Sequence, residues 1–147
     1  MKIAIVAGMF NERIVQSLIE GATLCYKEQF GNVDDDCITY HVPGAFEIPS
    51  FVNQLLLKDA KFDAVITLGC VIKGETAHFE YISESVTNAI MKLSVNNSKN
   101  IPILFGVLTT YNKEQALERS RVNDKTNKGY KVMNAAIKMV NTINKLT

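Results

Sequence analysis

The sequence predicts an α/β fold with a parallel sheet of four strands and helices on both faces. Apolar runs of strand length alternate along the chain with segments whose apolar residues recur every three or four positions. The composition is that of an ordinary globular protein, with 47% hydrophobic and 21% charged residues. Because strands that alternate with helices form parallel sheets through right-handed crossovers, we expect one such domain over residues 1–147.

Three strands are predicted in the first half of the chain, and the first is a continuous apolar run of the kind buried on both faces. Asn11 is predicted to cap the helix after it, and Gly31 to end that helix. Pro49 suits the first turn of a second helix, through Leu56, where a missing N–H costs little. The three strands are Ile3–Ala7, Cys37–Val42 and Asp63–Leu68.

The second half of the chain supplies the fourth strand and three more helices. A long helix runs to about Asn96, and the fourth strand is Ile101–Val107. Asn112 and Gln115 resemble a capping box at the start of a short helix, Lys113–Ser120, and the last helix carries apolar residues on one side, among them Val132, Val140 and Ile143. We expect the strand order 2-1-3-4 of a flavodoxin-like three-layer α/β/α sandwich, in which the loops after all four strands gather on one edge.

The segment Gly69–Tyr81 connects the third strand to the long helix. Gly74 would let a ligand approach the backbone, and unpaired N–H groups near Glu75 and Thr76 would face an anion at the helix N-terminus. His78 can transfer protons near neutral pH. The pattern predicts an anion site beside a proton shuttle. The alternative is a plain turn with a surface histidine, and the Glu75 carboxylate must point away from any bound anion.

Two other loops at the same edge carry candidate ligand contacts. Phe10 can either pack locally or offer a stacking surface for a flat ring, and the sequence leaves both open. Glu47 can either complement a helix dipole or accept hydrogen bonds from ligand hydroxyls and amines. The residues expected to gather at this edge are Phe10, Asn11, Ala45, Phe46, Glu47, Lys73, Gly74, Thr76 and His78.

Composition and missing motifs exclude several classes of function. The net charge of +1, with Lys and Arg spread along the chain, argues against nucleic-acid and anionic-membrane binding. No apolar run is long enough for a membrane span or signal peptide, and two histidines do not favour a metal site. Three scattered cysteines indicate reduced thiols in the cytoplasm. Dinucleotide, P-loop and nucleophile-elbow motifs are absent.

Several blocks together resemble the lumazine synthase family over nearly the whole chain. They are Phe10–Glu12, Pro43–Pro49, Gly69–Tyr81, Pro102–Thr110, Glu118–Arg119 and Asn127–Gly129. The resemblance implies the penultimate step of riboflavin biosynthesis, in which a ribitylamino-pyrimidinedione condenses with 3,4-dihydroxy-2-butanone 4-phosphate. It implies no metal and no organic cofactor.

The resemblance also implies a role for each matching residue. His78 would be the catalytic acid and base, and Glu75, Thr76 and Arg119 would bind phosphate. Pyrimidine and ribityl contacts would come from Phe10, Asn11, Ala45, Phe46, Glu47, Val71, Ile72, Phe105 and Lys128. Of these residues, Phe105, Arg119 and Lys128 would reach the site from an adjacent subunit.

Such a shared site implies at least a homopentamer, and twelve pentamers can close into a 60-subunit shell in the family. The chain begins at its first strand, and Ser120–Thr126 lacks the family's usual glycines, so we expect the pentamer and assign Lys125 no role. Riboflavin synthase is a candidate partner. Two alternatives are a flavin- or pterin-binding shell protein without catalysis and an archaeal-type riboflavin synthase.

Overall fold

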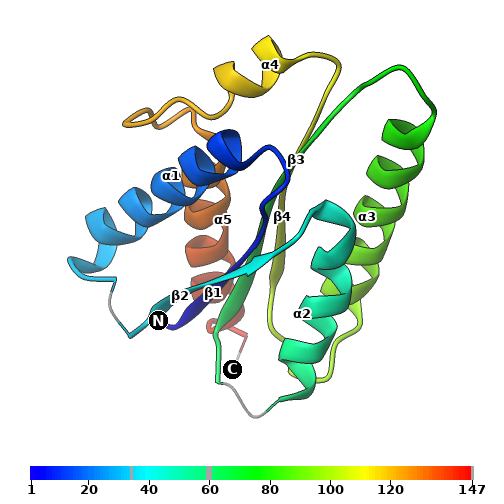
Figure 1. Ribbon diagram of the computed structural model, residues 1–147. Coiled ribbons are helices and arrows are strands. Elements are labelled where there is room, and N and C mark those ends of the chain that lie inside the picture. Colours follow the sequence, from blue (N-terminus) through cyan, green and yellow to red (C-terminus); the bar gives the residue numbers. More distant parts are fainter. Residues whose placement is uncertain (34, 59–60, 147) are drawn as a thin grey trace.

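The computed structural model describes residues 1–33, 35–58 and 61–146 as a parallel sheet between two layers of helices (Figure 1). The strand order β2-β1-β3-β4 confirms the predicted order. The strands are β1 (Ile3–Gly8), β2 (Cys37–Val42), β3 (Ala64–Ile72) and β4 (Ile103–Thr110). The helices are α1 (Glu12–Phe30), a 3-10 turn η1 (Ala45–Glu47), α2 (Ile48–Leu57), α3 (His78–Val95), α4 (Lys113–Glu118) and α5 (Lys128–Ile143).

Side chains that alternate along the central strands form a core on each face of the sheet. Ile3 and Ile5 of β1 pack with residues of α1 and α5, and Ala4 and Val6 pack with residues of α2 and α3. All residues of β1 are buried, as the continuous apolar run predicted. Figure 1 shows α1 and α5 on one side of the sheet and α2 and α3 on the other.

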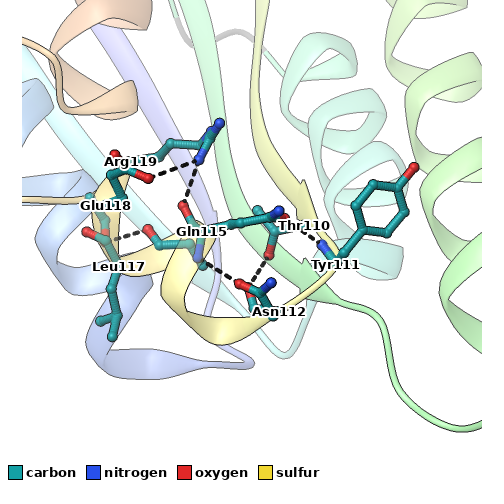
Figure 2. Close-up of polar contacts among 9 residues, drawn as sticks. Thr110, Tyr111, Asn112, Gln115, Leu117, Glu118 and Arg119 are labelled. Atoms are coloured by element: carbon teal, nitrogen blue, oxygen red, sulfur yellow. Dashed lines mark hydrogen bonds and ion pairs between the residues drawn. The ribbon is translucent and has the colours of Figure 1, made fainter.

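Two predicted helix boundaries are confirmed by their geometry. Gly31 has φ of 81° and donates its N–H to the carbonyl of Lys27, which ends α1 in the left-handed conformation that glycine tolerates. Asn112 Oδ1 accepts the N–H of Gln115 at 2.9 Å at the start of α4 (Figure 2). The Gln115 side chain accepts from the N–H of Tyr111, one residue before the cap.

The predicted ends of the third and fourth strands are wrong. β3 continues from Leu68 to Ile72, and β4 reaches Thr110, because the two strands remain paired beyond the end of β1. Gly69 suggested a loop, yet it lies within the strand, where a Cβ would stand only 3.3 Å from Ile48 Cδ1. The connection to α3 therefore shortens to residues 73–77. None of the helices in the described ranges has the length and apolar character needed to cross a membrane.

Candidate active site

A cavity of about 510 Å³ lies at the carboxyl edge of the sheet, between the loops that follow β1 and β2, the end of β3 and the start of α3. Its lining confirms that these loops gather at one edge. The lining residues are Phe10, Asn11, Pro43, Gly44, Ala45, Phe46, Glu47, Cys70, Val71, Ile72, His78 and Ile82. Pro43, Gly44, Cys70 and Ile82 were not among the predicted contacts.

Backbone packing brings the first two loops together. A Cβ on Gly8 would stand 2.5 Å from the carbonyl carbon of Gly44, so only glycine allows this approach. The N–H of Met9 donates to the Val42 carbonyl at 2.9 Å, and that of Phe10 to the Pro43 carbonyl at 3.0 Å. These contacts place Phe10 beside the segment 44–47 that lines the same cavity.

Two aromatic rings stand in solvent at the cavity. Phe10 is 74% exposed and Phe46 is 60% exposed. Exposed rings of this size are available to stack on a flat ligand, and Phe10 is not part of either buried core. The structure therefore favours the stacking interpretation of Phe10 over local packing.

Asn11 does not cap α1 as predicted. Its backbone is left-handed, with φ of 60° and ψ of 51°, and its side chain makes no capping hydrogen bond. Instead its Nδ2 donates to the carbonyl of Cys70 at 2.9 Å, which ties the β1–α1 loop to the end of β3. A capping side chain normally needs an extended N-cap backbone, and the left-handed backbone of Asn11 does not provide one.

The loop from β3 to α3 presents its polar groups to solvent. His78 is exposed, is the first residue of α3 and lines the cavity. The Thr76 Oγ1 accepts the His78 N–H at 3.3 Å, which leaves the hydroxyl proton free to donate. Among the described residues, no acceptor pairs with the backbone N–H of Glu75 or Thr76. Both are exposed, so an anion can reach them, although neither lines the cavity.

The remaining residues of this loop have simpler surroundings. A Cβ on Gly74 would meet no atom within 4 Å, so the chain itself does not require glycine there, and the space is open to a ligand. Lys73 turns to Glu80, with Nζ 3.2 Å from Oε1, and lies over the ring of Tyr111. A backbone hydrogen bond, and then the Lys73 ammonium, lower the pKa of Glu80. Lys73 lies at the expected edge of the sheet, directly after β3, but does not line the cavity.

A second groove, of about 360 Å³, holds the residues that were expected to serve an adjacent subunit. It runs along β4 to the start of α5 and does not share a lining residue with the cavity. The structure of one chain thus does not bring Phe105, Arg119 or Lys128 to His78. The lining residues are Phe105, Val107, Leu108, Thr109, Thr110, Arg119, Thr126, Lys128 and Lys131.

Two basic residues near this groove differ in their contacts. Arg119 follows α4, where its Nη1 donates to the Gln115 carbonyl at 3.1 Å and lies 3.8 Å from Glu118 Oε2 (Figure 2). Lys125 is absent from the lining, and its Nζ lies 3.8 Å from Glu28 Oε2 and over the ring of Tyr130. Lys125 therefore has a structural partner, in keeping with the lack of an assigned role.

Sequence reasoning missed Thr126 and Lys131 in the groove. Lys131 follows Lys128 by three residues, so a helical interpretation from residue 128 would have placed both on one face. In the ranges described, no three His, Cys, Asp or Glu side chains are grouped closely enough to hold a metal ion.

The chain is similar in sequence to known enzymes over nearly its whole length. A family model described as 6,7-dimethyl-8-ribityllumazine synthase matches residues 1–144. A protein of that name from Clostridium kluyveri is 45% identical over 146 residues, 99% of this chain and 92% of the relative. Another, from Limosilactobacillus reuteri, is 48% identical over 120 residues, 81% of this chain and 74% of the relative. These matches, with the strand order and the motifs at the sheet edge, show that the chain belongs to the 6,7-dimethyl-8-ribityllumazine synthase family.

Proposed function

We propose that the protein condenses 5-amino-6-(ribitylamino)pyrimidine-2,4-dione with 3,4-dihydroxy-2-butanone 4-phosphate to give 6,7-dimethyl-8-ribityllumazine. The observation that carries the proposal is the cavity whose lining includes the exposed rings of Phe10 and Phe46 together with His78. Membership of the family disfavours both alternatives, a shell protein without catalysis and an archaeal-type riboflavin synthase.

The pyrimidine would bind in this cavity. Phe10 stacks on its ring and Asn11 borders it, while the backbone of Val71 and Ile72 at the end of β3 contacts its polar edge. The ribityl chain lies along Ala45, Phe46 and Glu47, and the Glu47 carboxylate accepts hydrogen bonds from its hydroxyls. The support is that these residues line one cavity.

The phosphate of the second substrate would bind at the start of α3. The free N–H groups of Glu75 and Thr76 and the Thr76 hydroxyl donate to its oxygens. This places the butanone between the phosphate site and the ring. An imine then forms between the pyrimidine amine and the ketone with loss of water, phosphate is eliminated, and the ribityl-bearing nitrogen closes the ring with loss of a second water.

His78 would carry protons during these steps, while orientation of the two substrates supplies much of the rate. The Thr76 hydroxyl holds the backbone N–H of His78, which fixes the first turn of α3 beside the phosphate. Apart from the bonds made and broken between the substrates, these steps need only proton transfers, and no cofactor is included.

The proposal includes a ring of five chains whose sites are shared. The cavity and the groove lie on different parts of one chain, and a head-to-tail contact that joins one to the other builds a ring when the rotation between neighbouring chains closes. Phe105, Arg119 and Lys128 would then complete the neighbour's site. The outer face of α3 exposes Tyr81, Met91 and Val95, which gives such a contact apolar surface.

Sedimentation would test this ring. Five chains of 16.4 kDa give a particle of about 82 kDa, and a 60-subunit shell is the larger alternative. A stable monomer that still turns over both substrates would refute the shared site.

The proposal places the enzyme in the cytoplasm, with riboflavin synthase as the enzyme that uses its product. Its support is that Cys25, Cys37 and Cys70 are free thiols. Burial above all raises the pKa of each to about 11, so they stay protonated and unreactive.

The first test is to mix the purified protein with both substrates and to follow lumazine by absorbance and free phosphate in the same sample. We expect both products to rise together, faster than in the spontaneous reaction. Binding of the ring compounds by a folded protein without turnover would refute the proposal in favour of a binding protein. Riboflavin formed from lumazine alone would favour a riboflavin synthase.

A second test addresses His78, and the chain offers a matched control. His78→Ala should slow turnover by about a hundredfold, the low end of the range for a positioned acid and base, without loss of pyrimidine binding. His41→Ala removes the only other histidine, which is exposed in β2 and absent from the cavity lining, and it should have no effect. An unchanged rate in His78→Ala would remove His78 from the mechanism.

A further inference from the structure

The groove along β4 concentrates positive charge. Arg119, Lys128 and Lys131 all line it, and no carboxylate is among the lining residues. A groove lined by three cations, without an acidic residue, has the chemistry of an anion site. Arg119 and Lys128 already have roles in the proposed function, whereas Lys131 has none.

The position of the two lysines is unfavourable for the helix that carries them. Lys128 is the first residue of α5 and Lys131 the fourth, so both ammonium groups lie near the positive end of the helix dipole. No acidic residue occupies the first turn to offset them. Cations in the first turn of a helix oppose the helix dipole, so their presence at this position indicates a role other than helix stability.

The backbone of α5 cannot itself bind the anion. The N–H of Lys128 donates to the Arg119 carbonyl at 2.8 Å, and those of Gly129 and Tyr130 donate to Asn127 Oδ1. The first N–H groups of the helix are therefore used within the protein. Recognition of an anion in this groove must come from the cationic side chains.

The ammonium group of Lys131 is available for this purpose. In the ranges that the structure describes, no carboxylate lies within ion-pair distance of Lys128 or Lys131, whereas Lys125 nearby pairs with Glu28. The charge of Lys131 makes the smallest of the contributions that lower the pKa of Asp124. The Asp124 Oδ1 is held by the N–H and the hydroxyl of Thr126, and the pKa of Asp124 is lowered mainly by those bonds.

We propose that Lys131 is the third cation of a phosphate site in this groove, and that it raises the affinity for the phosphate dianion carried by the second substrate. The inference rests on the proposed function and extends it. Arg119 grips two phosphate oxygens with its planar fork, whereas Lys131 acts as a point charge. The same charge increases retention of the inorganic phosphate that the reaction releases.

The test uses Lys131→Gln in the assembled protein, with Lys138→Gln as a matched control. Lys138 is exposed on the same helix and does not line the groove, so its removal changes the net charge equally. Calorimetry with inorganic phosphate alone should show a Kd about fivefold higher for Lys131→Gln and an unchanged Kd for the control. Lys131→Arg keeps the charge and should bind phosphate as the unmodified protein does.

Kinetics gives a second, independent readout. Lys131→Gln should raise the KM for the phosphorylated butanone about fivefold and leave the KM for the pyrimidine and kcat within about twofold. An unchanged phosphate Kd in Lys131→Gln, or an equal change in Lys138→Gln, would overturn the inference and leave the proposed function intact. Loss of phosphate binding in Lys131→Gln, from a protein that does not turn over the two substrates, would support the anion site and refute the proposed function.

Discussion

Asn127 is fully buried, and its side chain joins three parts of the chain. Its Oδ1 accepts the N–H groups of Gly129 and Tyr130 at the start of α5, and its Nδ2 donates to the carbonyls of Ser17 in α1 and Arg121 in the preceding loop. We expect Asn127→Ala to lower the free energy of unfolding by about 3 kcal/mol. Loss of the cap accounts for about 1 kcal/mol, and the two donated bonds for about 1 kcal/mol each.

The assay is thermal unfolding followed by circular dichroism at one protein concentration, because assembly makes Tm depend on concentration. A loss of about 3 kcal/mol corresponds to a fall in Tm of roughly 10 °C for a domain of this size. Asn112→Ala is the matched control, since Asn112 caps α4 with one exposed hydrogen bond and should cost only about 1 kcal/mol.

Asn127→Asp separates the two contributions. The carboxylate keeps the cap acceptor and loses both donors, and it faces the carbonyl oxygens of Ser17 and Arg121 in a buried site. We expect a loss at least as large as that of Asn127→Ala. Equal losses in Asn127→Ala and Asn112→Ala, or a neutral Asn127→Asp, would refute this account of the buried amide.

Three further predictions concern Arg119 in the groove, Asn11 at the cavity and Tyr130 in α5. Arg119→Ala should raise the KM for the phosphorylated butanone by about tenfold and that for the pyrimidine much less, since a phosphate fork is lost; equal effects on both substrates would exclude the clamp. Asn11→Ala should lower Tm more than Asn11→Gly, because both lose the bond to Cys70 but glycine tolerates φ of 60°; identical Tm values would show that the left-handed backbone costs nothing. The hydrogen bond to Glu28, followed by burial, raises the pKa of Tyr130 from 10.0 to about 12. The stability that this bond gives is complete below pH 10.0 and is lost as the pH rises through about 12, so the urea midpoint of the unmodified protein should fall more over this range than that of Tyr130→Phe.

Local signals in the sequence were enough for much of the fold. The continuous apolar run of β1 identifies a strand buried on both faces, and Gly31 marks the end of α1 because few other residues accept its left-handed φ. The alternation of strands and helices predicts the layers, and the flavodoxin-like arrangement expected for them predicts the strand order.

Features that depend on distant partners were not predictable in the same way. Asparagine commonly caps helices, but the side-chain amide of Asn11 donates to the carbonyl of Cys70, 59 residues away. β3 extends to Ile72 only because β4 continues beside it, so the strand's end is a property of the pair. Lys131 joins the groove through the packing of α5 against β4, and its helical spacing from Lys128 places the two on one face without showing which element that face packs against.

The extended end of β3 forms the floor of the cavity, and the loop that follows it forms the rim. The two parts should differ in how readily their backbone opens to solvent. Backbone N–H groups alternate between the two edges of a strand, and the Cys70 carbonyl faces Asn11 on the β1 side, so Val71 is the residue of this stretch whose N–H faces β4; its amide proton should exchange with deuterium only when the sheet opens as a whole. The Lys73 N–H still donates to the Thr110 carbonyl at 2.9 Å, whereas residues 74–77 lie outside any helix or strand and their amides should exchange through local opening. A bound phosphate would therefore slow exchange at the rim and leave the floor unchanged, so a labelling experiment can separate occupancy of the anion site from stabilisation of the sheet.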